Sequence, residues 1–96
     1  MIARVATFNS APPDDRGWVV EALKGVEGVR SCYHLHDPER NVALSISIFD
    51  DESDIQAAVD AVSARAREIG HQGPGPDEIR IYEVVGHVEN TVSGAG

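Results

Sequence analysis

The run from Val42 to Phe49 constrains the fold more than any other part of the sequence. Large aliphatic residues occupy every second position, and small residues, closed by one aromatic residue, occupy the positions between them. Successive side chains of a β-strand point to opposite faces of a sheet, so this alternation is typical of a half-buried strand. We expect the aliphatic set to pack on the core and the other set to face away from it. The aliphatic set is Val42, Leu44, Ile46 and Ile48, and the other set is Ala43, Ser45, Ser47 and Phe49.

The rest of the chain divides into strands and helices around this run. Residues of high β-propensity predict three further strands, at Ile2 to Asn9, Val29 to His36 and Ile79 to Val88. Apolar residues spaced four or three apart predict two helices, from about Arg16 to Lys24 and from the acidic segment 50–53 to Gly70. The segment from Asp37 to Asn41 contains a proline and is typical of a turn.

The predicted order of elements is β-α-β-β-α-β. Crossovers of this kind place both helices on one face of a four-stranded antiparallel sheet, the ferredoxin-like arrangement of an α+β domain, and leave the other face bare. A chain of 96 residues buries only about 60–65% of the surface of its unfolded state, so its stability is marginal. Such domains commonly gain stability by covering a bare face with a second chain. We expect one domain over residues 1–88 and a flexible tail over residues 89–96.

Charge and cysteine content argue against several classes of function. The chain has 8 Lys and Arg residues against 16 Asp and Glu, a net charge of −8, which disfavours nucleic acids and anionic membranes as partners. Its one cysteine, Cys32, cannot form an internal disulfide, which indicates a reducing compartment. No stretch approaches the roughly 20 apolar residues that span a bilayer, and no apolar run of signal-peptide length begins the chain. We therefore expect a soluble, cytoplasmic protein.

Four segments give the chain a resemblance to a known family. They are Gly28 to Tyr33, Asp37 to Glu39, Ser45 to Glu52 and Ile81 to Val85. With them the sequence resembles the dimeric α/β-barrel superfamily, nearest to the antibiotic-biosynthesis-monooxygenase-like domains, over roughly residues 2–88. The resemblance implies a ferredoxin-like fold and a homodimer in which two sheets face each other. Its members include cofactor-free oxygenases, haem-degrading enzymes and proteins without an assigned activity, so the fold alone does not carry a function.

Neither a bound cofactor nor a metal is expected. The haem-degrading branch uses an Asn in the first strand, where this chain has Thr7, and a Trp in the second helix, whereas Trp18 lies in the first. No phosphate loop or dinucleotide fingerprint is present. Cys32, His34 and His36 share one face of a strand, but no closing ligand is obvious, and structural zinc usually has four.

The candidate site follows from which side chains share the bare face. Pairing through the turn would set Cys32 opposite Ser45 and Arg30 opposite Ser47, so that the histidines of this strand point away from the helices. A loop longer by one residue would instead turn His34 under the helices, where polar burial is costly. The predicted constellation is Thr7, Asn9, Arg30, Cys32, His34, Ser45, Ser47 and Phe49, with Tyr82 added.

These residue types suit a small-molecule site. His34 would accept a proton near neutral pH, Arg30 or the serines would hold a developing oxyanion, and Tyr82 is the third catalytic candidate. A cofactor-independent monooxygenase, an oxidoreductase acting on an aromatic or polyketide-like compound, needs little else, because its base turns an electron-rich phenol into a carbanion that reacts with oxygen. The alternative is a non-catalytic dimerisation or ligand-binding module, in which Cys32 and the serines only pack. An enclosed cavity containing His34 or Tyr82 would favour the enzyme.

Overall fold

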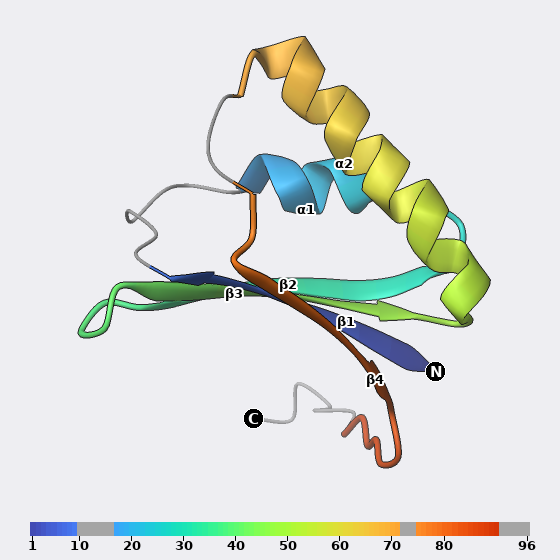
Figure 1. Ribbon diagram of the computed structural model, residues 1–96. Helices are drawn as coiled ribbons and strands as arrows, with labels where there is room; N and C mark the ends of the chain where they lie inside the picture. The colour runs from blue at the N-terminus through green and yellow to red at the C-terminus, as the bar shows by residue number, and fades with distance from the viewer. Residues whose placement is uncertain (10–16, 72–74, 91–96) are drawn as a thin grey trace, which may run out of the picture.

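A computed structural model describes residues 1–9, 17–71 and 75–90 (Figure 1). The elements follow the predicted order, which is confirmed. They are β1 (Ile2–Asn9), α1 (Gly17–Leu23), β2 (Val29–Asp37), β3 (Val42–Phe49), the short 3₁₀ helix η1 (Glu52–Asp54), α2 (Ile55–Ile69) and β4 (Glu78–Glu83). β4 ends earlier than predicted, at Glu83 rather than Val88. Among the described residues, no helix has the length and apolar character needed to cross a membrane.

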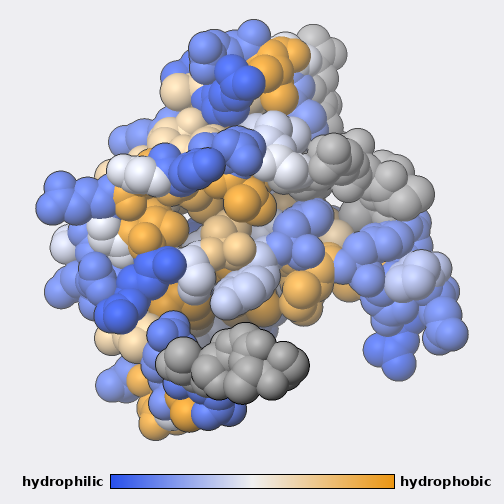
Figure 2. All heavy atoms as spheres, turned by 180° about the vertical axis from the view of Figure 1, so that it is seen from behind, coloured by the Kyte–Doolittle hydropathy of each residue, from blue (hydrophilic) through white to orange (hydrophobic). Residues whose placement is uncertain are grey.

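The four strands form one antiparallel sheet in the order β2-β3-β1-β4. Both helices lie on the same face of this sheet, with α2 above α1, and no part of the described chain between β1 and β4 covers the opposite face (Figure 1). From behind, apolar side chains are visible in the band between the helices and the sheet (Figure 2). The fold is therefore the predicted sheet with two helices on one side. Residues 84–90, which include the first two residues of the predicted tail at 89–96, have no regular structure, and residues 91–96 lie outside the described ranges.

The hydrophobic core lies between the helices and the sheet, around the ring of Phe49. This side chain is only 1% exposed and packs with Leu23 of α1 and Ala58 of α2. Serines 45 and 47 lie on the same side of β3 as Phe49 and line the same space. The prediction that the aliphatic set of β3 packs on the helices is therefore wrong. Alternation separates the two sets of side chains but does not say which set meets the helices, and here the small set does.

The pairing of β2 with β3 differs from the predicted register. Cys32 lies opposite Ser47 rather than Ser45, and His34 lies opposite Ser45. The shift arises because Asp37 pairs with Val42, so the loop comprises residues 38–41 rather than the expected residues 37–40 and lies one residue farther along the chain. A shift of two residues keeps every side chain on its face. His34 and the serines thus share a face, as predicted, but that face is the one under the helices.

The 3₁₀ helix η1, which leads into α2, is capped by its own side chains and lies in close contact with the turn before β2. The Asp51 carboxylate accepts a hydrogen bond from the Ser53 amide (3.0 Å), and the Asp54 carboxylate accepts one from the Asp51 amide (3.1 Å). Gly28 has a φ of +89°, and a Cβ built there would lie 2.2 Å from Cγ of Asp54. Only glycine combines this backbone conformation with such close approach. Gly28 therefore lets β2 and the first turn of the helical segment meet.

Candidate functional site

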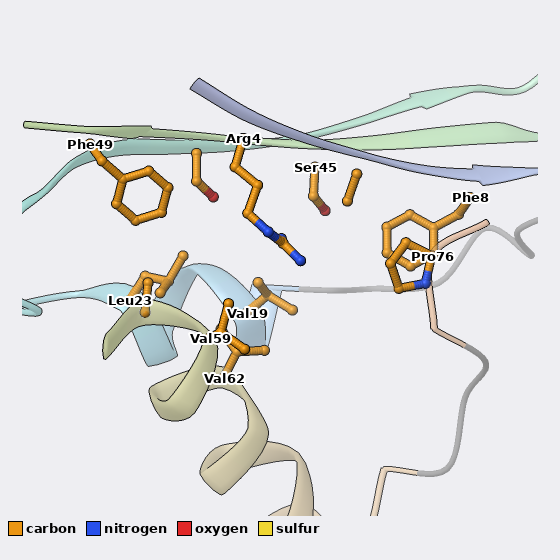
Figure 3. Close-up of a pocket in the computed structure, with 12 residues that line it drawn as sticks. Arg4, Phe8, Val19, Leu23, Ser45, Phe49, Val59, Val62 and Pro76 are labelled. Carbon is orange, nitrogen blue, oxygen red and sulfur yellow. The ribbon is translucent and has the colours of Figure 1, made fainter. Parts of the chain in front are cut away.

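A cavity of about 120 Å³ lies between the sheet and the two helices (Figure 3). One wall is the helix-facing side of β1 and β3, and the opposite wall is apolar and comes from both helices. The sheet contributes Arg4, Ala6, Phe8, Ser45, Ser47 and Phe49; the helices contribute Val19, Leu23, Ala58, Val59 and Val62; Pro76 closes the lining. The space exists because the two serines are too small to fill the region between the two phenylalanine rings.

Arg4 is the charged side chain of this cavity. It stands on β1 opposite Ser47 and reaches from the sheet toward the helices (Figure 3). Burial disfavours the charged guanidinium and lowers the pKa of Arg4 below its ordinary value. None of the ion pairs formed among the described residues involves Arg4. The cavity thus combines apolar walls with one cation and two hydroxyl groups.

Both serine hydroxyls of the cavity are hydrogen-bonded to side chains of β2. Nδ1 of His34 and Oγ of Ser45 are 2.8 Å apart, and the hydroxyl donates or accepts according to the imidazole tautomer. The Ser47 hydroxyl donates to Sγ of Cys32 over 3.7 Å. The ring of Phe8 meets His34 edge-on, with centroids 6.3 Å apart at 67°. His34 is half-buried and lies beside the cavity, and its hydrogen bond to Ser45 connects it to the cavity wall.

The predicted constellation is divided between two faces of the sheet, so its prediction as one open-face site is wrong. Cys32, His34, Ser45, Ser47 and Phe49 lie on the helix side. Thr7 pairs with Leu44, and Asn9 with Val42, on the open side, where Tyr82 lies opposite Ala3 and is 51% exposed. A pocket on the open face lined by His34 and Arg30 is therefore excluded by this fold. The cause is the reversed assignment of β3, since Thr7 and Asn9 of β1 do lie on the open side.

Arg30 lies apart from the histidine it was expected to assist. A register irregularity between Val29 and Ser31 puts Arg30 out of the regular pairing of β2. Its guanidinium pairs with the Asp50 carboxylate at 3.1 Å, and both side chains are more than half exposed. This pair ties two exposed ends of strands together. It leaves Arg4, rather than Arg30, as the arginine beside the serines.

Arg4 is the cavity residue that the sequence reasoning missed. Arg4 shares its face of β1 with Ile2, Ala6 and Phe8, which are apolar and make this the core side of the strand. A charged residue inside such an apolar set was the available signal, because buried arginine is rare unless it has a partner. As for metal ligands, the described part of the chain has no group of three His, Cys, Asp or Glu side chains that could hold an ion.

Comparisons with known proteins give structural likeness but no sequence relative. No family model matches the chain, and no curated protein matches it. Among solved structures, a candidate antibiotic biosynthesis monooxygenase from Chloroflexus aurantiacus is similar, with 16% identity, a TM-score of 0.65 and coverage of 92% of this chain and 96% of that one. The protein Rv0793 from Mycobacterium tuberculosis has 11% identity, a TM-score of 0.67 and coverage of 92% and 98%.

A third solved structure contains a bound compound. It is the monooxygenase from the gene ActVA-Orf6 of Streptomyces coelicolor, in complex with nanaomycin D. This chain shares 18% identity with it at a TM-score of 0.60, over 94% of this chain and 92% of that one. Identities this low establish the fold alone. The ferredoxin-like fold of the antibiotic-biosynthesis-monooxygenase-like proteins, which the resemblance implied, is thereby confirmed.

Proposed function

We propose that this protein binds a small aromatic compound in the cavity beneath the helices and oxygenates it without a cofactor. One observation carries the proposal: Ser45 lies in the wall of an apolar cavity, and its hydroxyl is hydrogen-bonded to His34 behind that wall. Neither His34 nor Tyr82 lines the cavity itself. Phe8 and Phe49 provide aromatic surfaces for a planar ring. The shared fold with a monooxygenase whose structure contains nanaomycin D adds support but assigns no residue.

His34 acts in this proposal as the proton acceptor. A phenol with the pKa of tyrosine, about 10, is about 3.5 units less acidic than imidazolium, so the transfer costs about 5 kcal/mol before any stabilisation. The Ser45 hydroxyl lies between the cavity and His34, so it can receive the phenolic proton while passing its own to Nδ1. A positive group near the phenolate would offset much of the remaining cost.

The oxygenation balances with dioxygen as the only co-reactant. The phenolate places electron density on its para carbon, which gives one electron to dioxygen and then bonds to it. The peroxide takes up the proton held by His34. The para carbon then loses its C–H proton, a C=O bond forms, and the O–O bond breaks. The outer oxygen leaves as hydroxide and combines with the released proton to give water. The substrate thus loses four electrons and becomes a quinone, and dioxygen gains them.

A second function, binding without turnover, is favoured by the size of the cavity. Its volume of about 120 Å³ is below the 300–1,000 Å³ that is usual for small-molecule sites. An engineered cavity of about 150 Å³ holds benzene, so this space suits one aromatic ring. A ligand-binding module would use the same walls but would not need the proton acceptor. The two functions differ in what His34 does.

We also infer that the protein works as a homodimer through the open face of its sheet. The aliphatic set of β3 lies there beside three partly exposed side chains of the neighbouring strands: Tyr33 is 56%, Leu35 46% and Tyr82 51% exposed. A contiguous apolar sheet face of this kind is a common protein–protein contact. A second copy, related by a twofold axis, would present the same surface in return.

Oxygen consumption with a one-ring phenol, 2-methoxyphenol, tests the proposed chemistry. The wild-type protein should consume one dioxygen for each quinone formed, and His34→Gln should lower this rate at least about a hundredfold, the usual range for loss of a general base. His36→Gln is the matched control, because His36 is exposed on the same strand and should keep the rate. Binding without turnover in the wild type would support the second function. A protein that binds no phenol would contradict both functions.

A further inference from the structure

The guanidinium of Arg4 is an unusual group to place in this cavity. It faces apolar side chains of both helices, including Val19, Val59 and Val62 (Figure 3). Long cationic side chains normally bury their stems and keep the charged head in water. Arg4 instead extends from the middle of the central strand β1 into the space beneath the helices. The protein therefore holds a half-buried cation in the wall of this cavity.

Four of the other arginines show that carboxylates are not scarce in this protein. The net charge is −8, and four arginines at the surface have acidic partners. These pairs are Arg30 with Asp50, Arg40 with Asp37, Arg65 with Glu68 and Arg80 with Glu78. Arg4, which loses more water than they do, has no carboxylate within ion-pair distance in the described ranges. A partly buried charge without a partner costs stability, so the arrangement needs another explanation than folding.

We infer that Arg4 is an anion-binding residue, and that the ligand of the cavity is a one-ring aromatic compound carrying an anionic oxygen group. The inference rests on the proposed small-molecule site and names its substrate class. Ser47 of β3 lies directly opposite Arg4. Ser45 lies opposite Ala6, which is the next residue of β1 on the same face, so the two serines lie on the strand beside Arg4. An arginine can bind a carboxylate through two parallel hydrogen bonds and a phenolate through one.

The geometry also gives Arg4 a part in the proposed chemistry. An anionic oxygen held at Arg4 would lie on the serine-bearing wall, near the Ser45 hydroxyl that contacts His34. The positive charge would stabilise a phenolate as it forms and so reduce the cost of transferring its proton to His34. The volume of the cavity limits the ring system to about one ring unless the helices move.

Benzoate and benzamide are the probes for this inference, because they have the same shape and differ in charge. Their binding to isotope-labelled protein is measured from amide NMR shifts, which also show whether the probe lies between β1 and α2. The wild type should bind benzoate at least about tenfold more tightly than benzamide. Arg4→Met should abolish the preference, Arg4→Lys should keep part of it, and Arg67→Met, which removes an exposed cation of α2, should leave it unchanged.

The melting temperatures of the same variants separate ligand binding from a structural role. Arg4→Met removes the desolvated charge, so its melting temperature without ligand should equal or exceed that of the wild type. A fall of several degrees would mark the guanidinium as structural and overturn the inference. Equal affinity for both probes in the cavity, or a benzoate preference that survives in Arg4→Met, would also overturn it while leaving the proposed function intact. Failure of both probes to bind would refute the cavity as a ligand site altogether.

Discussion

Replacement of Leu35 by Asp tests whether the open face of the sheet is a dimer contact. Leu35 lies on β2 opposite Leu44 and is 46% exposed in the single chain. Complete burial of a leucine contributes about 1.5–3 kcal/mol, so covering the exposed half contributes about 1 kcal/mol. A twofold dimer contains the residue twice. Loss of these contacts therefore weakens dimerisation by about 2 kcal/mol, which raises the dissociation constant about 30-fold.

The introduced carboxylates increase this effect. Each Asp would lose water in an apolar contact, at a further cost of at least about 1 kcal/mol. The total of about 4 kcal/mol per dimer corresponds to about a thousandfold weaker association. The single chain should remain folded, because substitutions at exposed positions usually change stability by about 0.5 kcal/mol or less. Val20→Asp is the matched control, since Val20 is 40% exposed on α1, on the other side of the sheet.

Light scattering after size-exclusion chromatography, repeated over a dilution series in the micromolar range, measures the effect. The wild type and Val20→Asp should elute with twice the chain mass, and Leu35→Asp should elute with the single-chain mass and an unchanged circular dichroism spectrum. A wild type that has the single-chain mass throughout would refute the dimer. A Leu35→Asp protein as dimeric as the wild type would refute this face as the contact.

Three further predictions concern the backbone, bound groups and the C-terminal segment. Gly28→Ala should destabilise the fold by about 3 kcal/mol in chemical denaturation, because the left-handed conformation and the contact with Asp54 both oppose a side chain. Gly70→Ala is the control: Gly70 has a φ of +69° and open space around it, so this change should cost only about 1 kcal/mol. Equal costs for the two variants would disprove the contact argument. Purified protein should show no flavin or haem absorbance and no stoichiometric metal; a reproducible visible band, or one zinc per chain by elemental analysis, would contradict this. Deletion of residues 90–96 should leave the melting temperature nearly unchanged, whereas a fall of several degrees would show that the segment docks.

The sequence predicted the fold well because the relevant signals are local. The alternating run of β3, the helical spacing of Ile55, Val59 and Val62, and the turn at Asp37 each act within a few residues. The strand pairs follow from the connections between them. The candidate site was predicted less well, because it depends on which face of β3 meets the helices. That choice is made by contacts between elements far apart in the sequence, such as Phe49 with Leu23.

The rule that the most apolar face is the inner one fails here for a physical reason. In the proposed dimer, helices would cover one side of the sheet and the partner's sheet would cover the other, so neither side would face solvent and hydrophobicity could not rank the two faces. On the helix side of β3, Ala43, Ser45 and Ser47 are small, so Phe49 makes most of the contact between this strand and the helices. Larger residues at the serine positions would fill the space in front of Arg4 and separate His34 from the cavity. The small residues that led to the wrong assignment of faces therefore also leave the space in which we propose that a ligand binds, and the aliphatic side of β3 is the face that we propose for the dimer contact.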